Sequence, residues 1–278
     1  MTFSIVGRSA DGASWGVAVA SKFLAAGAVV PGARAGIGAI ATQSFVNLRY
    51  LPDGLALLAD GLSAQQVLDR LTAADGLRAQ RQAGIVDRDG GAAAWTGEEC
   101  IPWAGSACGQ DHAVQGNCLA GPDVVGQMSA VFTASDPGLP LAKRLLAALA
   151  AGDGAGGDRR GRQSAALLVV TEGGGYGGGS DVAVDLRVDD HPAPVAELTR
   201  LLGLHELYFG RPSPRDLLPL QGELEAEVDR LLGGLGHGGN QPLDERLLDW
   251  MGWENYEERH VAGAIDHTVL GKLREAGR

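Results

Sequence analysis

Side chains that could do chemistry gather at only a few places in this 278-residue chain. The densest is GGDRRGRQSAA, where Asp158, Arg160, Gln163 and Ser164 come just before an apolar segment. Arginine binds carboxylates through paired hydrogen bonds, so this cluster could recognise a peptide or an N-acyl amino acid. A solvated loop or an ion-pair network would use the same residue types. We expect at most one of its three arginines to face a site.

Cysteines and histidines give little support for thiol or metal chemistry. Cys100, Cys108 and Cys118 show no metal-ligand spacing, and their odd number does not suggest a disulfide framework. No base stands near Cys100 or Cys118 in the sequence, so both are expected to be small buried residues. The six histidines are scattered, five of them beyond residue 190. We therefore predict no metal site and no cofactor.

The opening stretch MTFSIVGRSADGASWGVAVASKF predicts that Thr2 is held in a sheet. Apolar residues alternate with small or polar ones on both sides of Asp11-Gly12, a strong hairpin signal. Most chain termini are poorly ordered, whereas a strand begins here at once. From this pattern alone, Thr2 is an ordinary residue at the start of a strand.

The elements that would position these residues alternate in blocks. The patterns predict two short helices within residues 51–74, the second capped by Ser63, and two more at 122–134 and 139–152. Strands are expected at residues 3–8, 14–21, 35–44, 81–97 (a hairpin around Asp89-Gly90), 112–121, 163–170 and 180–188. This order suggests helices covering both outer faces of stacked sheets.

A change in residue composition along the chain predicts two domains. From residue 189 onward the chain is helical in pattern and carries 17 acidic and nine basic residues, whereas the preceding part is rich in Gly, Ala and Val. Pro192 and Pro194 break any element that precedes them. We place the domains at residues 1–189 and 190–278.

Composition excludes several classes of protein. With 45% hydrophobic and 21% charged residues the chain is globular, and its net charge of −11 argues against nucleic acid or an anionic membrane as a partner. No apolar run approaches the roughly 20 residues of a membrane helix. No basic segment followed by an apolar one opens the sequence, so we expect a reduced, cytoplasmic protein.

Several motifs together resemble the domain-of-unknown-function family 1028. They are MTFSIV, GVAVASKFLAAGAVVPGARAGIGAIATQ, ECIPWAG, VQGN and GGDRRGRQSAALLVV, in this order across the first domain. The resemblance implies an α+β fold, the four-layer α-β-β-α sandwich of N-terminal-nucleophile hydrolases. The opening is also distantly similar to proteasome β-subunits, except that Ala20-Ser21-Lys22 stands where those have an acidic residue.

The resemblance implies that Thr2 is a nucleophile once Met1 has been removed. A threonine hydroxyl needs an adjacent base, and a free α-amine on the same residue can serve as one. A nearby cation would lower the pKa of that amine. Lys22 and Arg34 are the two candidates for this cation. Donors for an oxyanion are expected from Thr42, Gln43 and Ser44 in ATQS, or from Asn117, although each could be a cap or turn residue.

The second domain resembles the peptidoglycan-binding-like module that follows the first domain in this family. YFGRP and DWMGWENYEER carry the similarity, and helical spacing with Asp266 as a possible cap predicts a small helical bundle. Trp250, Trp253 and Tyr256 could form a ligand-stacking surface, but aromatic residues of small domains mostly lie in the core.

Two functional hypotheses follow. In the first, the chain is an amidohydrolase that cleaves a small peptide or an N-acyl amino acid through Thr2. In the second, the sandwich serves binding or assembly without catalysis, and the helical module recruits a partner. Homo-oligomers are compatible with both hypotheses. The mass of the intact protein separates them, because a retained Met1 removes the threonine amine.

Overall fold

The computed structural model describes residues 2–278, which divide into two compact units. The first ends at Leu201 and the second is Leu202–Arg278. The sequence places the boundary after residue 189, at the prolines. In the structure Pro194 begins helix α5 (Pro194–Phe209), whose Val195 and Leu198 are buried, so the units separate inside this helix.

A six-stranded sheet in the first unit contains the chain's first strand at its centre. The strand order is β10-β9-β2-β1-β8-β7, and all neighbours are antiparallel. The predicted hairpin around Asp11-Gly12 forms, with Gly12 at a φ of 72°. The bounds are β1 Thr2–Arg8, β2 Ser14–Ser21, β7 Gly105–Gly109, β8 His112–Asn117, β9 Ser164–Thr171 and β10 Val182–Val188.

A four-stranded sheet packs against this first sheet. Its order is β3-β4-β5-β6, with β3 Pro31–Arg34, β4 Gly38–Ser44, β5 Arg81–Asp87 and β6 Ala92–Thr96. Between the sheets, Val6, Val17 and Val19 pack with Ala39 and Val86 in one buried cluster. The short strands β3 and β7 were not predicted, because their glycine and alanine residues give almost no alternating signal.

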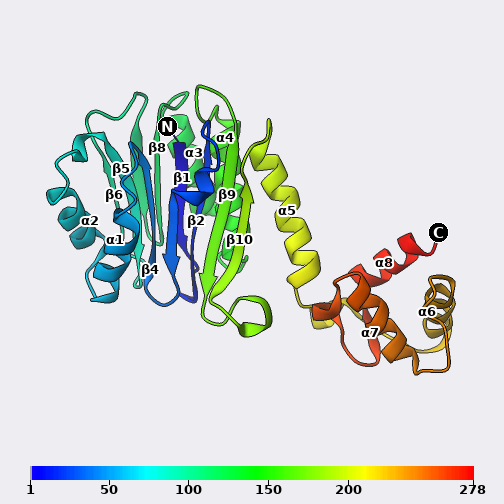
Figure 1. The fold of residues 1–278 in the computed structure, drawn as a ribbon. Helices are drawn as coiled ribbons and strands as arrows, with labels where there is room; N and C mark the ends of the chain where they lie inside the picture. The colour runs from blue at the N-terminus through cyan, green and yellow to red at the C-terminus, as the bar shows by residue number, and fades with distance from the viewer. Residues whose placement is uncertain (1) are drawn as a thin grey trace. The chain divides into compact units, whose positions relative to one another are not determined.

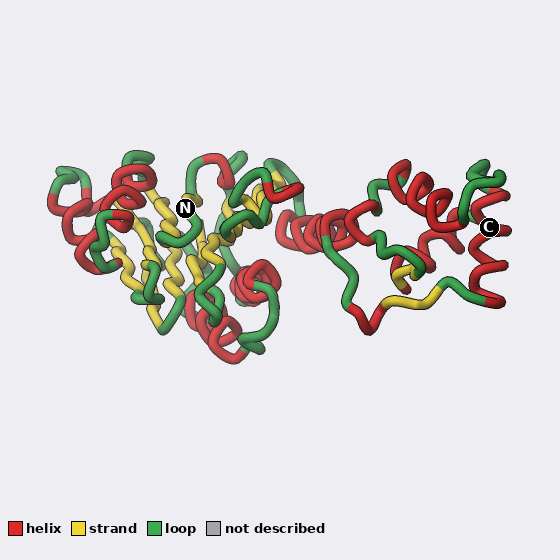
Figure 2. Tube along the Cα trace, turned by 90° about the horizontal axis from the view of Figure 1, so that it is seen from below, coloured by secondary structure: helices red, strands yellow, loops and turns green. Residues whose placement is uncertain are grey.

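Four helices cover the outer faces of the two sheets (Figures 1 and 2). Helices α3 (Asp123–Ala134) and α4 (Leu141–Gly154) pack on the six-stranded sheet, and α1 (Tyr50–Ala59) and α2 (Ala64–Ala73) pack on the four-stranded sheet. The predicted Ser63 cap is present, and Gln66 completes a capping box with it. The α+β class is confirmed, and the helices and sheets of this unit are stacked in four layers.

The second unit is mainly helical, with α6 (Gly222–Gly234), α7 (Leu243–Trp253) and α8 (His267–Ala276). Asp266 caps α8 through Thr268 N, as predicted. A two-stranded sheet of β11 (Leu217–Pro219) and β12 (Ala264–Asp266) was not expected in the bundle. Trp250 and Tyr256 lie in its core, whereas Trp253 is 76% exposed.

Candidate functional site

A row of polar side chains crosses the six-stranded sheet at the end where β1 begins. Thr2 pairs with Ser21 of β2 on one side and with Asn117 of β8 on the other, and Ser21 pairs in turn with Ser164 of β9. Residues directly opposite each other in a sheet share a face. We call Ser164, Ser21, Thr2 and Asn117 the polar row; every member is buried.

Thr2 is held by hydrogen bonds to both its side chain and its backbone. Its Oγ1 lies 3.0 Å from Ser21 Oγ, and either hydroxyl can donate. Its carbonyl oxygen accepts from Gln43 Nε2 of the facing sheet at 3.2 Å. Ser4, on the same face of β1 as Thr2, donates to Gln43 Oε1, so the Thr2 side chain also points between the two sheets; the residue is only 5% exposed. This hydroxyl has a defined position, which a frayed terminus could not provide.

Beneath the row lies a network of buried amide side chains. Gln82 on β5 is its hub, since Nε2 donates to the carbonyls of Gly116 and Gly105 and to Thr96 Oγ1. Gln82 Oε1 accepts from Gln43 Nε2 and from Asn117 Nδ2, both at 2.8 Å. The network therefore joins β5 and β4 of one sheet to β8 of the other.

The carbonyl contacts of Gln82 fix the orientation of the whole network. Because carbonyls accept only, Gln82 must present its nitrogen to them and its oxygen to Asn117. Asn117 therefore keeps its Oδ1 free, and this buried atom has no hydrogen-bond partner among residues 2–278. Gln115 on β8 donates to Ser4 Oγ at 2.6 Å, and its Oε1 is also without a partner in that range. A buried acceptor without a partner is costly, so these atoms mark a place where a donor would be stabilising.

Neither predicted cation contacts Thr2. Lys22 directly follows Ser21, but its Nζ lies 3.4 Å from the carbonyl oxygen of Arg162 and its backbone N–H donates to Asp158. Arg34 pairs with Gly38 at the start of β4, whereas Gln43, which reaches Thr2, lies near the opposite end of that strand. Arg34 is therefore at the wrong end of the sheet for the predicted role.

Of the ATQS residues, only Gln43 reaches Thr2. Side chains alternate along β4, so Thr42 and Ser44 point away from the facing sheet. The backbone N–H of Thr42 donates to Val30 and its Oγ1 to Asn47. Both donors of Thr42 are therefore already hydrogen-bonded elsewhere. The oxyanion donors expected from Thr42 and Ser44 are not found at Thr2. Asn117 lies beside Thr2, as the prediction required.

The arginine cluster is mostly committed to contacts within the protein. Arg160 binds the buried carboxylate of Asp158 at 2.8 Å, and that hydrogen bond raises the pKa of Arg160. Arg162 pairs with Asp153. The four residues predicted to bind substrate (Asp158, Arg160, Gln163 and Ser164) all make such contacts: Gln163 donates to Asp190, and Ser164 bonds the backbone of Phe23 and Ala26.

Arg159 is the exception in this cluster. Its Nε donates to the Sγ of Cys118 at 3.1 Å, and Cys118 directly follows Asn117 in the sequence. The Arg159 residue is exposed. It has no carboxylate partner in the described part of the chain, and the same is true of the exposed Lys22. Lys22 follows Ser21 in the chain, and Arg159 contacts Cys118, which follows Asn117, so a cation without a carboxylate partner in the described residues lies near each side of the Ser21–Thr2–Asn117 segment.

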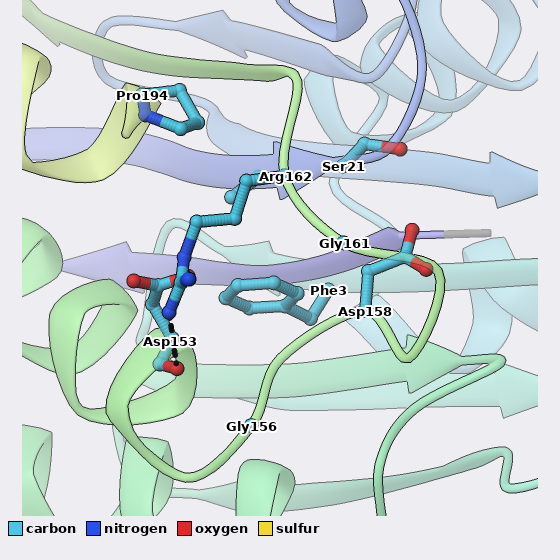
Figure 3. Close-up of a pocket in the computed structure, with 9 residues that line it drawn as sticks. Phe3, Ser21, Asp153, Gly156, Asp158, Gly161, Arg162 and Pro194 are labelled. Atoms are coloured by element: carbon cyan, nitrogen blue, oxygen red, sulfur yellow. Dashed lines mark hydrogen bonds and ion pairs between the residues drawn. The ribbon is translucent and has the colours of Figure 1, made fainter. Parts of the chain in front are cut away.

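A small pocket lies beside the row, and Ser21 of the row is among the residues that line it. Phe3, Arg162 and Asp153 line it, and Figure 3 shows the Arg162 side chain running past the Phe3 ring toward Asp153. The Ser21 hydroxyl points away from that ring (Figure 3). The cavity volume is about 50 Å³, far below the roughly 300–1,000 Å³ of a ligand site. This pocket is not the candidate site.

Sequence reasoning missed Ser21, Ser4, Gln82 and Gln115 as parts of the site. A signal was present, because Gln82 and Gln115 stand beside small and apolar residues in the buried parts of β5 and β8. Their partners, however, come from distant segments. As for other chemistries, the described residues contain no cluster of three potential metal ligands, and within residues 2–278 no helix has the length and apolar character of a membrane span.

Comparisons with known proteins agree on the family. Residues 2–198 match the family model described as "Family of unknown function (DUF1028)", and residues 208–273 match the one described as "Putative peptidoglycan binding domain". No curated protein matches the chain. The crystal structure of protein SPO2555 from Silicibacter pomeroyi, assigned to DUF1028, is similar at 30% identity with a TM-score of 0.66, covering 81% of this chain and 92% of its own. The chain therefore belongs to the DUF1028 family.

Proposed function

We propose that this protein is an N-terminal-nucleophile amidohydrolase whose nucleophile is Thr2 after removal of Met1. One observation carries the proposal: the Thr2 hydroxyl is held by Ser21 while the buried Oδ1 of the adjacent Asn117 has no partner among residues 2–278. A threonine α-ammonium is a donor that would suit this acceptor. The four-layer order of helices and sheets is the arrangement expected of such enzymes and adds support.

The proposed reaction proceeds through an ester on Thr2. Thr2 Oγ1 attacks the amide carbonyl carbon, and the α-amine accepts the hydroxyl proton. The same amine then gives that proton to the leaving nitrogen as the carbon–nitrogen bond breaks. A water molecule hydrolyses the ester, releasing the acid and regenerating the hydroxyl. Ser21 orients Oγ1, and Gln43 holds the Thr2 carbonyl.

The mass of the intact protein and a matched set of variants test this proposal. Processed protein should hydrolyse members of a panel of N-acyl amino acids and dipeptides. Thr2→Ala should lower the rate at least 1,000-fold, whereas Thr2→Ser should keep measurable activity, because it retains both groups. The control is Thr171→Ala, which removes a threonine that bonds Ser14 at the other end of β2.

Two results would overturn the proposal. One is a mass that includes Met1 in protein that is nevertheless active. The other is a Thr2→Ala variant as active as Thr171→Ala. Either result would favour the second hypothesis, a sandwich that binds without catalysis.

The helical unit favours a second, binding function. Its match to a peptidoglycan-binding model suggests a polymer of sugars and peptides as ligand, and Trp253 offers an exposed aromatic face on α7. Sedimentation with insoluble peptidoglycan should retain the protein, and Trp253→Ala should reduce retention. Leu248→Ala, which removes a less exposed apolar side chain of the same helix, is the comparison variant.

A further inference from the structure

Large apolar side chains are exposed on two loops at the Thr2 end of the sandwich. Phe23 and Leu24 follow Ser21 at the end of β2, and Phe45, Val46 and Leu48 follow Ser44 at the end of β4. Both strands end on the same side, because Gln43 reaches the carbonyl of Thr2, the residue opposite Ser21. Of these residues, Phe45 has the largest exposed fraction, 65%. Apolar side chains gathered in this way mark a binding surface.

The loop that carries Phe45 is held from beneath by a charged cluster. Arg81 bonds both the carboxylate of Asp75 and the carbonyl of Phe45, and Asn47 donates to the same carboxylate. Burial acts to raise the pKa of Asp75, but the hydrogen bonds from Arg81 and Asn47 outweigh it and lower that pKa overall. The apolar side chains of this loop are therefore presented outward on a fixed backbone.

The loop that carries Phe23 and Leu24 is fixed in the same manner. Ser164 Oγ donates to the carbonyl of Phe23 at 2.6 Å and accepts from Ala26 N. Ala25 N donates to the carbonyl of Asp189. A surface whose backbone is already ordered loses little conformational freedom when it binds a ligand.

Lys22 and Arg159 add positive charge at this end. Both are exposed and lack a carboxylate partner in the described residues, in a chain of net charge −11. A ligand that satisfied the loops and the cations together would carry a large apolar group and one carboxylate. A membrane is disfavoured as that ligand, because the acidic chain would be repelled by anionic lipid.

We infer that the substrate is an N-acyl amino acid with a medium-length or longer acyl chain. The inference rests on the proposed function. The acyl chain lies on the Phe23 and Phe45 loops, and the carboxylate pairs with Lys22 and Arg159. The amide bond between these two groups is thereby brought to Thr2, which lies between Ser21 and Asn117 in the polar row.

Binding to the Thr2→Ala variant tests this inference without turnover. The probe is N-octanoylglycine, compared by calorimetry with N-acetylglycine and with octanamide. The octanoyl compound should bind at least tenfold more tightly than either, since one comparator lacks the chain and the other lacks the carboxylate. Equal binding of N-acetylglycine would overturn the role of the loops, and equal binding of octanamide the role of the cations.

Variants locate the binding surface. Phe45→Ser should weaken N-octanoylglycine binding five- to tenfold, while Leu139→Ser, an exposed apolar control between α3 and α4, should change it less than twofold. Arg159→Gln and Lys22→Gln should each weaken it at least threefold, while Arg88→Gln in the β5–β6 turn should not. Loss of binding in the control variants as well would contradict the placement of the ligand.

Two further readouts separate this inference from its alternatives. Tight binding of N-octanoylglycine without hydrolysis by processed wild-type protein would support the surface and overturn the proposed function. Hydrolysis of N-acetylglycine and N-octanoylglycine at equal kcat/KM would support the proposed function and overturn this inference. If light scattering shows a dimer that Phe45→Ser dissociates, the loops are an interface between copies and the acyl assignment is wrong.

Discussion

Strand β2 carries a serine–threonine pair at each end, and the two pairs have different surroundings. At one end Ser14 Oγ lies 2.7 Å from Thr171 Oγ1, and at the other Ser21 Oγ lies 3.0 Å from Thr2 Oγ1. The first pair is half-buried beside turns, whereas the second is buried beside an amide network. The same pair of residue types thus closes the end of a strand in one place and belongs to the candidate site in the other.

The remaining polar groups of the two ends also differ. At the Ser14 end, Arg8 pairs with Asp111, and the Asp87 carboxylate accepts hydrogen bonds from the backbone of its own turn. At the Thr2 end, Asn117 Oδ1 lacks a partner within residues 2–278 and two cations lack counter-charges there. A buried acceptor without a partner can accept a hydrogen bond from a ligand, so we expect the Thr2 end to be the one that meets a ligand.

The largest expected effect on stability is at Gln82. Gln82→Leu removes the donor to two carbonyls and the acceptor for Gln43 and Asn117, leaving several buried groups without partners. We expect the free energy of unfolding to fall by roughly 3–5 kcal/mol in urea denaturation. The control Gln65→Leu, on the exposed face of α2, should cost less than about 0.5 kcal/mol. Equal losses of unfolding free energy in the two variants would mean that Gln82 does not stabilise the amide network.

Asp87 provides the corresponding test at the opposite end. Its carboxylate accepts from the backbone of Ala64, Asp89 and Gly91. Asp87→Ala should lower the free energy of unfolding by about 2–4 kcal/mol. It should leave ligand affinity at the Thr2 end unchanged when measured well below the melting temperature. Asp89→Ala, in the same turn but exposed, is the comparison, and a loss of affinity in Asp87→Ala would erase the distinction between the ends.

Asp75 is expected to have a smaller effect, because it supports one loop. Asp75→Asn weakens the charged contacts to Arg81 and should cost about 1–2 kcal/mol at pH 7. The folded pKa of Asp75 is lowered, so its contribution is present above the unfolded value of about 3.9 and is lost as the pH falls toward the folded value. Amide hydrogen exchange at residues 45–48 should accelerate in this variant but not in Asp69→Asn, and unchanged exchange would show that the loop is fixed by other contacts.

The smallest effect concerns His112, which begins β8 at the end away from Thr2. Burial lowers its pKa, and its ring nitrogens contact Gln110 O and Ser129 Oγ. The unfolded chain therefore binds the proton more readily, and stability is lost as the pH falls below about 6.5. Unfolding measured at pH 7.5 and 5.5 should show about 0.5 kcal/mol less pH dependence in His112→Gln than in wild type. A larger pH dependence of the unfolding free energy in the variant would contradict a lowered pKa of His112 in the folded chain.

The sequence predicted the local structure of the first unit well, because local signals specify it. Asp11-Gly12 and Asp89-Gly90 form the expected turns, and Ser63 caps its helix. Of the candidate site, Thr2, Gln43 and Asn117 were predicted and are brought together. Arg34 was placed wrongly because nothing in the sequence shows which end of the sheet a short strand reaches. Gln82 and Gln115 were missed, since a buried glutamine is recognisable as a hub only when its distant partners are known.

The central position of β1 has a consequence for the kinetics of folding. The strand pairs with β2 nearby but also with β8, more than a hundred residues later in the chain (Figure 1). At roughly 5–20 residues per second, synthesis reaches Asn117 only some 5–20 s after the first hairpin has been made. Until then one edge of β1 has no partner strand. The segment of the polar row from Ser21 through Thr2 to Asn117 is therefore completed only after β8 has been made.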